Sequence, residues 1–350
     1  MAGNNSSRTS LLRPEVILEI CGGHGAGKTE LLITVAVHFL VYGGSGPQIS
    51  ALNKAAIWQH PSELSDSKGG EVYFIDLDGK FDMVRMIKVL KSHIERYHQD
   101  QQPEAELVKR QEHMLQDCLA RFTLFTCHST LEVLTVLIAM QRLLGRQKDS
   151  GQPFAGRTDS VGARMLLLDN VAAFYYQDRA TRLGNKRISI IGPGEDKLDD
   201  PATCGTLTLQ RLHASLSTLL SQVCIDHRMA CICTKFIPSS SNITTASSIT
   251  VESAQSTDSH ASEAITMKEF MMLSWQSVVT HRIVLSPCHL SLMHGTTLHQ
   301  GFIIRLYPQK RGIHTGLDHD VSSENSYQCC VEIGNTGVRN FILERGDVAL

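Results

Sequence analysis

Residues 22–29 carry the pattern that most constrains this chain. They are Gly22, Gly23, His24, Gly25, Ala26, Gly27, Lys28 and Thr29, and they match the glycine-rich phosphate-binding loop at each fixed position. The apolar residues 16–20 before them predict a short buried strand, and residues 28–39 have apolar side chains at helical spacing. This strand–loop–helix context favours a true phosphate loop over a glycine-rich turn that matches by chance.

The chemistry of the loop predicts a role for each part. Glycines allow consecutive backbone N–H groups to turn inward around a phosphate, and the helix that follows points its positive end at the same anion. Lys28 is expected to reach the β- and γ-phosphates, and the Thr29 hydroxyl is expected to bind Mg²⁺. The predicted cofactors are therefore ATP and Mg²⁺.

Acidic residues follow two other predicted strands. Asp169 ends the apolar run 165–168, where a carboxylate can hold Mg²⁺ opposite Thr29, directly or through water. The alternative is an ordinary acid that starts a turn. Asp76 and Asp78 end the strand 71–76, and a carboxylate there can orient the water that attacks the γ-phosphate. The alternative is a turn that leads into the next helix, with Asp82 as its N-cap.

Two further groups of cations are candidates for binding phosphate. Lys235 follows the predicted strand 229–233, and it is interpreted either as a γ-phosphate sensor or as a surface lysine, with the surface lysine favoured. Arg179, Arg182, Lys186 and Arg187 lie in a predicted loop at 177–205 and can contact DNA phosphates, but acidic residues follow and favour a solvated mixed-charge loop. The aromatic residues 174–176 are expected to be core and helix-surface side chains.

The order of elements predicts an α/β fold. Strands at 71–76, 122–126, 164–169 and 229–233 alternate with helices after residue 82, over 131–144 and over 209–223, with a polar stretch near 99–106. Four later segments, 275–285, 302–307, 330–333 and 338–343, are expected to be strands alone, and the last two are expected to form a hairpin. We therefore expect a mostly parallel sheet flanked by helices, with an antiparallel C-terminal extension.

Length and composition predict one domain in a reducing compartment. Of the 350 residues, 1–13 are expected to be a disordered tail and 14–350 a single domain with flexible insertions at 43–70, 145–161 and 236–264. Ten cysteines without a CxxC pair argue against a zinc site. A net charge of -2 provides no global basic field, and no apolar run is long enough to span a bilayer.

The motifs resemble those of a known family. The phosphate loop with Glu30, the stretch 74–78, the stretch 166–170 and the stretch 233–235 occur in the order of the RecA-type ATPase core. More narrowly, residues 74–83 and 173–179 resemble the eukaryotic paralogues of the RecA-type recombinase, as do Trp275-Gln276 and His281-Arg282. The resemblance covers residues 14 to about 285.

The resemblance implies an ATP-binding subunit of a nuclear complex of recombinase paralogues. Such a complex acts in homologous-recombination repair of DNA double-strand breaks and assists assembly of the recombinase filament on single-stranded or branched DNA. The chain departs from active recombinases at two positions: Asp78 replaces a catalytic glutamate, and Lys235 replaces a phosphate-sensing glutamine. We therefore expect weak ATP hydrolysis. Because residues 236–264 contain no Lys or Arg, we expect DNA contacts to be made through the complex.

The resemblance also predicts a position in the complex. About 15 polar residues precede the first strand, where recombinases carry a further domain and a docking linker, so we expect a terminal subunit that does not polymerise. Its docking groove is expected near the strand 71–76 and the helix that follows it, by addition of a strand to the sheet edge. Two alternatives are a P-loop kinase of a small molecule and a scaffold that binds no nucleotide.

Overall fold

A computed structural model describes residues 15–43, 69–98, 104–149, 163–184, 208–237, 248–249, 267–268, 271–290, 299–308, 327–334 and 337–344. The helices are α1 (Lys28–Tyr42), α2 (Met83–His98), α3 (Glu104–Ala120), α4 (Thr130–Asp149), α5 (Tyr175–Gly184), α6 (Leu209–Asp226) and α7 (Leu273–Val278). The strands are β1 (Ile17–Gly22), β2 (Glu71–Asp76), β3 (Phe122–Thr126), β4 (Arg164–Asp169), β5 (Met229–Phe236), β6 (Ser248–Ile249), β7 (Met267–Lys268), β8 (His281–Leu290), β9 (His299–Pro308), β10 (Tyr327–Gly334) and β11 (Gly337–Glu344).

One nine-stranded sheet organises the described residues, in the order β11-β10-β9-β8-β1-β5-β4-β2-β3. The six strands from β8 to β3 are all parallel. The three strands from β9 to β11 extend the sheet in antiparallel fashion, and β10 and β11 form the expected hairpin. The structure therefore confirms an α/β fold with a mostly parallel sheet and an antiparallel C-terminal extension.

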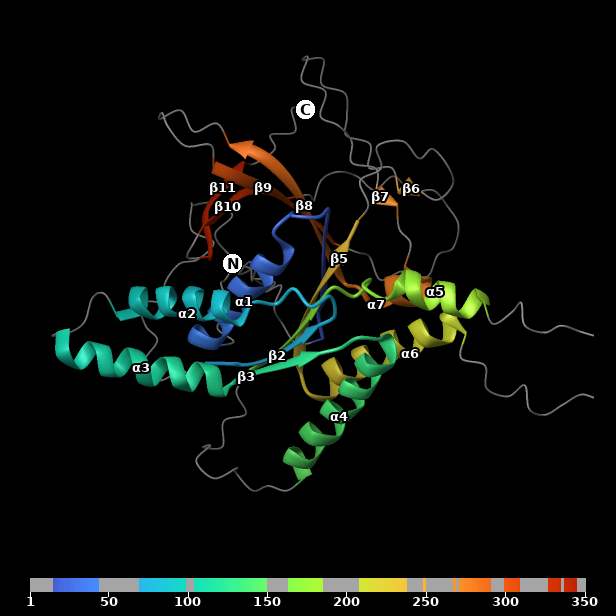
Figure 1. Cartoon of the computed structure of the whole chain (residues 1–350), viewed down its shortest axis with the longest axis horizontal. Helices are drawn as coiled ribbons and strands as arrows, with labels where there is room; N and C mark the ends of the chain where they lie inside the picture. The colour runs from blue at the N-terminus through green and yellow to red at the C-terminus, as the bar shows by residue number, and fades with distance from the viewer. Residues whose placement is uncertain are drawn as a thin grey trace, which may run out of the picture.

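Helices cover both faces of the parallel strands. Figure 1 shows α1, α2 and α3 on one side of the strands and α4 to α7 on the other. One core cluster joins Leu18, Phe74 and Leu167 of the sheet to α1 and α2, and a second joins Ile17 and Leu168 to α4, α6 and α7. Since alternate residues of a strand face opposite sides of a sheet, the apolar runs of β1 and β4 supply both clusters.

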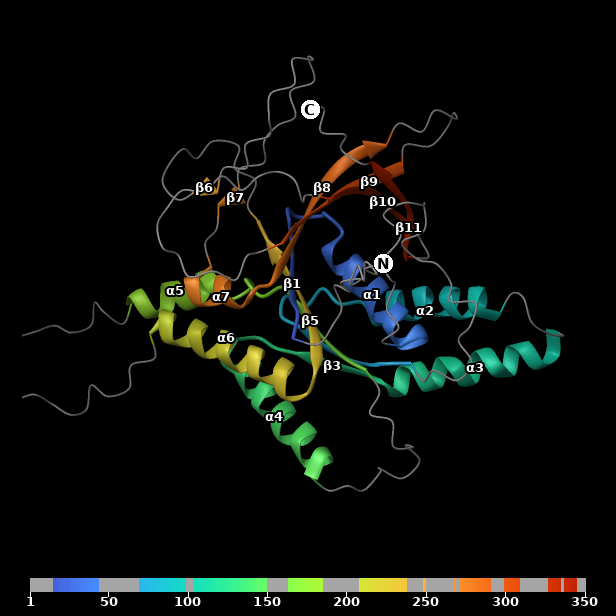
Figure 2. The ribbon, with the colours of Figure 1, turned by 180° about the vertical axis from the view of Figure 1, so that it is seen from behind.

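The antiparallel extension packs against the first helix layer. Seen from behind, β9, β10 and β11 curve over the side of the molecule that carries α1 and α2 (Figure 2). Gly337 begins β11 with a φ of 97°, and a Cβ there would lie 3.1 Å from Val89 Cγ1 and 3.2 Å from Thr34 Oγ1. A glycine is therefore favoured at this turn by its backbone angle and by its close approach to α1 and α2.

Four sequence expectations about secondary structure are wrong. Helix α3 was not expected, helix α5 extends into the predicted loop 177–205 as far as Gly184, and α4 continues to Asp149 through the first residues of the predicted linker 145–161. The expected strand 275–285 is helix α7 followed by β8. Trp275 lies in α7, and its indole donates a hydrogen bond to the buried Glu19.

The expected tail and most of the expected insertions lie outside the described residues. Residues 1–13, 44–68, 150–161 and 238–247 are among these. Ser248–Ile249, within the expected insertion 236–264, pairs with Met267–Lys268 in a short antiparallel ladder. The flexibility of these segments stays a prediction.

Candidate functional site

The phosphate-binding loop opens into a cavity at the carboxyl ends of the parallel strands. The loop joins β1 to α1, Asp169 ends β4, and the segment that follows β2 forms another wall. The cavity has a volume of about 420 Å³ and is lined by His24, Gly25, Ala26, Gly27, Lys28, Thr29, Glu30, Ile33, Asp78, Lys80, Asp82, Arg85, Asp169, Asn170 and Phe236. Ligands of open α/β sheets bind at this edge, so the cavity is the candidate site.

The loop holds Lys28 at its centre. Gly25 and Gly27 have φ angles of 70° and 75°, in the left-handed region that glycine adopts without strain. The Lys28 ammonium donates hydrogen bonds to the carbonyl oxygens of Gly22 at 3.0 Å and Gly23 at 2.7 Å. Burial lowers the pKa of Lys28, and the negative charge of Asp169 opposes that shift. The ammonium thus lies folded back across the loop, within reach of an anion bound there.

Thr29 and Asp169 meet directly in the cavity. The Thr29 hydroxyl donates a hydrogen bond of 2.5 Å to Asp169 Oδ2, and the Thr234 hydroxyl donates to Asp169 Oδ1. Burial raises the pKa of Asp169, while the two hydroxyl hydrogen bonds act to lower it. This set of oxygen atoms suits Mg²⁺, which nucleotide sites hold through one or two protein ligands together with phosphate oxygens and water.

Asp76 shapes the loop that follows β2. Its Oδ1 accepts a hydrogen bond from the Gly79 N–H at 3.0 Å, and its Oδ2 accepts one from the Phe81 N–H at 3.2 Å. Gly79 has a φ of 69°, so the chain turns there in a conformation that favours glycine. Both oxygens of Asp76 are thus engaged by the loop, and the turn interpretation fits this residue better than a catalytic one.

The same loop leads into α2 as expected. Asp82 Oδ1 accepts hydrogen bonds from the N–H groups of Val84 at 2.8 Å and Arg85 at 3.1 Å. These are the contacts of an N-cap residue with the free donors of the first turn. The prediction of Asp82 as the N-cap of this helix is confirmed.

Asp78, like Asp82, is a carboxylate of this loop that lines the cavity. Its Oδ2 lies 2.7 Å from the Lys80 ammonium. Its Oδ1 is buried and, among the described residues, has no hydrogen-bond partner. A buried carboxylate oxygen without a hydrogen-bond partner is costly, and water or a hydrated metal ion would satisfy it. The water-orienting role of Asp78 remains a prediction.

Lys235 does not face the cavity, and the favoured surface interpretation is wrong. Its side chain is 2% exposed and its ammonium lies 3.1 Å from Oε1 of the fully buried Glu19. Arg282 Nε donates to Glu19 Oε2 at 2.6 Å, and the Trp275 indole donates to Oε1 at 2.8 Å. Burial acts to raise the pKa of Glu19, but the charges of Lys235 and Arg282 hold it below its ordinary value. Lys235 thus belongs to a buried ion cluster.

The alternation of side chains along β5 explains this result. Cys231 and Cys233 belong to the core cluster on the α6 side of the sheet, and Lys235 continues that face. Thr234 faces the other way and contacts Asp169. The site residue is therefore Thr234, one position before the residue that the motif suggested. The alternation of side chains along β5 could have shown that Thr234 and Lys235 face opposite sides of the sheet.

Phe236, Glu30 and Arg85 also line the cavity, and sequence reasoning assigned none of them to the site. The ring centroid of Phe236 lies 4.0 Å from that of His24 in the predicted loop and 6.0 Å from the Lys28 ammonium. Arg85 Nε donates to Glu30 Oε1 at 2.8 Å, which ties α2 to the first turn of α1. No motif links Glu30 to Arg85, because the contact depends on how the two helices pack.

Tyr175, Tyr176 and Arg179 lie on α5, and none of the three lines the cavity. Tyr175 is buried and Tyr176 is 54% exposed, which confirms one core and one helix-surface aromatic. Arg179 is exposed, and the side chains of Arg182, Lys186 and Arg187 lie outside the described residues. A role of this cluster in DNA binding stays a prediction.

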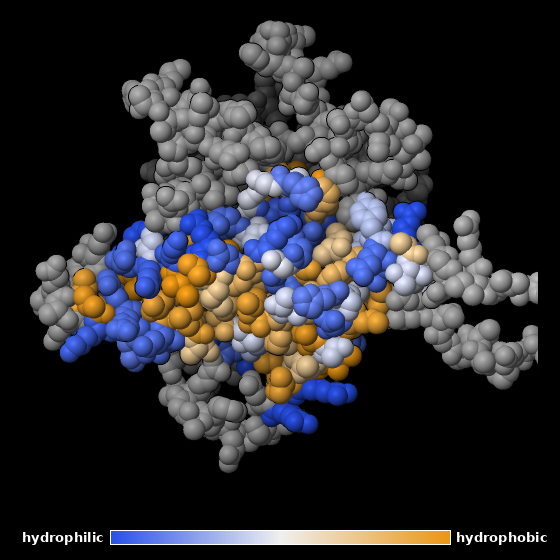
Figure 3. Space-filling view, in the orientation of Figure 1, coloured by the Kyte–Doolittle hydropathy of each residue, from blue (hydrophilic) through white to orange (hydrophobic). Residues whose placement is uncertain are grey.

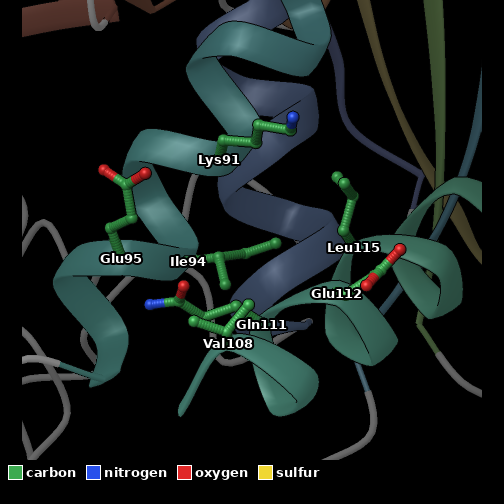
Figure 4. Close-up of a pocket in the computed structure, with 7 residues that line it drawn as sticks. All are labelled: Lys91, Ile94, Glu95, Val108, Gln111, Glu112 and Leu115. Atoms are coloured by element: carbon green, nitrogen blue, oxygen red, sulfur yellow. The ribbon is translucent and has the colours of Figure 1, made fainter. Parts of the chain in front are cut away.

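A second cavity lies between α2 and α3. It has a volume of about 310 Å³ and is lined by Lys91, Ile94, Glu95, Val108, Gln111, Glu112 and Leu115. Figure 4 shows Ile94 and Leu115 directed into the gap between the helices, whereas the Glu95 carboxylate points away. The cavity has apolar walls and a charged rim, and it brings together no pair of groups suited to catalysis.

Two kinds of feature are absent from the described part of the chain. No group of three or more His, Cys, Asp or Glu side chains is placed to hold a metal ion there. None of the described helices is both long enough and apolar enough to cross a membrane.

Comparison with known proteins supports the sequence resemblance. The chain is 23% identical to the mouse DNA repair protein XRCC2 over 273 residues, which cover 77% of this chain and 72% of the mouse protein. It is also 23% identical to the Arabidopsis thaliana DNA repair protein XRCC2 homolog over 309 residues, covering 78% of this chain and 69% of that protein. No protein-family model matches the sequence. The resemblance to this recombinase paralogue is confirmed, as a distant homology.

Proposed function

We propose that this chain is an ATP-binding subunit with a RecA-like core that acts in DNA repair by homologous recombination. The observation that carries the proposal is the junction of the phosphate loop with Asp169, where Thr29 and the strand-end carboxylate meet in one cavity. The similarity to XRCC2, named as a DNA repair protein, supplies the biological context. A nuclear location, and a role in recombinase filament assembly on single-stranded or branched DNA, follow from that context.

In this proposal, different residues of the cavity contact different parts of the nucleotide. The backbone N–H groups of Gly22 to Thr29 bind the phosphates, and Lys28 leaves the carbonyl oxygens of Gly22 and Gly23 to contact the β- and γ-phosphates. Thr29 and Asp169 hold Mg²⁺, and Thr234 orients Asp169 through its hydroxyl. Mg²⁺ supplies charge that neutralises the phosphate oxygens.

Hydrolysis of the bound ATP is slow in this proposal. Asp78 stands where the family has a glutamate, and its carboxylate is one methylene shorter, so it falls short of the attacking water. Lys235, which stands where the family has a phosphate-sensing glutamine, is held inside the protein by Glu19. Two groups that accelerate hydrolysis in active recombinases are thus changed in this chain, which fits a subunit that uses ATP mainly as a bound ligand.

The sheet edge provides a docking place for a recombinase paralogue. The docking groove was expected near β2 and α2 at an exposed sheet edge, but β2 itself pairs with β4 on one side and β3 on the other. β3 is the outermost parallel strand and pairs only with β2 among the described strands. Nearby exposed apolar side chains are Leu124 on β3 and Leu131 and Ile138 on α4. Figure 3 shows apolar surface around these elements. We assign the edge of β3 to a partner strand.

The test of the proposed function is binding of a non-hydrolysable ATP analogue to the purified chain with Mg²⁺. Lys28→Ala removes the main cation at the phosphates and should weaken binding by roughly a hundredfold, on the scale of two strong charge-assisted hydrogen bonds. The exposed Lys88 of α2, which does not line the cavity, provides the control Lys88→Ala. Equal affinity of the Lys28→Ala and wild-type proteins would sink the phosphate-loop assignment and favour a scaffold that binds no nucleotide.

A further inference from the structure

The loop after β2 brings a second lysine to the wall of the phosphate cavity. Lys80 lines the same cavity as Lys28, Thr29 and Asp169. Its side chain is 58% exposed, and its ammonium lies 2.7 Å from Asp78 Oδ2, whose side chain is 16% exposed. The ion pair is therefore at the cavity mouth, where the Lys80 side chain is open to solvent and can reorient.

The backbone around Lys80 is fixed by Asp76. The Asp76 carboxylate accepts the N–H of Gly79 on one side of Lys80 and the N–H of Phe81 on the other. Gly79 completes the turn with a φ of 69°, and a Cβ there would meet no atom within 4 Å, so the backbone angle is what favours glycine. The backbone that carries this cation is therefore already ordered, and binding an anion restricts only the Lys80 side chain.

The charges of the cavity call for an anion with several negative groups. Burial lowers the pKa of Lys28, and the nearby positive charge of Lys80 lowers it further. Asp169 and Asp78 oppose these effects without reversing them. A third cation on the wall, Arg85, is engaged by Glu30. A polyphosphate that contacts both lysines replaces their repulsion with two favourable interactions.

The order of strands indicates which phosphate meets Lys80. The phosphate loop follows β1, Asp169 ends β4, and the Lys80 loop follows β2, the next strand beyond β4. The loop N–H groups enclose the inner phosphates, and Asp169 marks the metal position beside Thr29. A cation that approaches from beyond Asp169 faces the outermost phosphate of a nucleotide seated in the loop.

We propose that Lys80 contacts the γ-phosphate of a bound nucleoside triphosphate, exchanging Asp78 Oδ2 for phosphate oxygens, so that the loop after β2 distinguishes a triphosphate from a diphosphate. This inference rests on the proposed function of the cavity. It adds a residue that determines which nucleotide state the subunit holds. Contact with the γ-phosphate also frees the second oxygen of Asp78 from its ion pair.

The experiment compares affinities for a non-hydrolysable ATP analogue and for ADP, each measured by displacement of a fluorescent diphosphate with Mg²⁺ present. Lys80→Gln should weaken binding of the triphosphate by about tenfold, because the charge-assisted hydrogen bond from the Lys80 ammonium to the γ-phosphate is lost. ADP has no γ-phosphate, so its affinity should change by less than about twofold. Lys80→Arg should keep the triphosphate preference. Lys88→Gln, on the exposed surface of α2, is the matched control and should change neither affinity.

An unchanged ratio of triphosphate to diphosphate affinity in Lys80→Gln overturns the inference, whether both affinities fall together or neither changes. Lys28→Ala separates this result from failure of the proposed function. If Lys28→Ala loses both nucleotides while Lys80→Gln keeps the wild-type ratio, only the inference fails. If Lys28→Ala retains both nucleotides at wild-type affinity, the proposed function fails and the inference fails with it.

Discussion

The ammonium of Lys235 lies 3.1 Å from Oε1 of Glu19, and both side chains are buried. The same carboxylate accepts hydrogen bonds from Arg282 and Trp275. Strands β1, β5 and β8 and helix α7 are therefore joined through one acidic side chain. A buried charge with several partners contributes little net free energy while intact, but the loss of one member is costly.

Replacing Glu19 by Gln should destabilise the protein strongly. The substitution keeps the size of the side chain but removes the negative charge that Lys235 and Arg282 contact inside the protein. Breaking a buried ion pair from one side typically costs about 3–5 kcal/mol of unfolding free energy. Urea unfolding followed by circular dichroism measures the change. The exposed Glu112→Gln on α3 is the control, and a Glu19→Gln protein as stable as this control would contradict the proposed importance of the cluster.

The stabilisation from Glu19 should also depend on pH. Its pKa in the folded protein lies below the ordinary value of 4.5, so the folded state binds its proton less readily than the unfolded state does. The contribution is therefore fully present above pH 4.5 and is lost as the pH falls through the lower folded pKa. The stability difference between wild type and Glu19→Gln should be constant near neutral pH and should shrink in acid. A difference that grows below pH 4.5 would contradict this assignment.

The hydrolysis rate tests the role of Asp78. If this carboxylate is too short to hold the attacking water, Asp78→Glu should restore the missing reach and raise ATP hydrolysis by roughly tenfold or more, on the scale of general-base effects. Single-turnover phosphate release measures the rate. The conservative change Asp226→Glu at the end of α6, outside the cavity lining, is the control. Rapid hydrolysis by the wild type, or no gain in Asp78→Glu, would count against the hypothesis.

Local patterns predicted the parts of the site that lie within one element or one turn. The phosphate loop is recognised by the spacing of its glycines, Lys28 and Thr29. Asp82 is recognised as an N-cap by its position just before an amphipathic helix. Asp169 was found because parallel strands bring their carboxyl ends to one edge, although only the structure shows its contact with Thr29. The strand-end position predicted for Asp169 therefore agrees with the structure.

Contacts between distant elements were beyond sequence reasoning. Lys235 was misplaced because a shift of one residue along a strand turns the side chain to the opposite face, where Glu19 of another strand holds it. From the sequence, Asp76 and Asp78 are equally placed for catalysis. The hydrogen bonds that Asp76 accepts from Gly79 and Phe81 distinguish the two residues. Helix α3 was missed because many of its side chains are polar and its apolar face is narrow.

The last prediction concerns the edge of β3 and its partner. Backbone groups of Arg121 and Cys127 bond to β2, so along this strand the even-numbered residues between them direct their N–H and C=O groups outward. Leu124→Pro therefore removes an outward donor that an added strand needs, at an edge position where proline is tolerated. Leu124→Ala, which shortens the side chain but keeps the N–H, separates the two effects.

Co-expression with a recombinase paralogue and affinity purification measures the outcome. Leu124→Pro should reduce recovery of the partner strongly and Leu124→Ala only mildly, since main-chain hydrogen bonds give strand addition most of its affinity. Leu131→Asp on α4 should also weaken the complex if the apolar surface beside the edge belongs to the interface. Leu273, which is 77% exposed on α7, supplies the control Leu273→Asp. Full recovery of the partner with Leu124→Pro would show that a different surface carries the contact, because the substitution closes the β3 edge to any added strand.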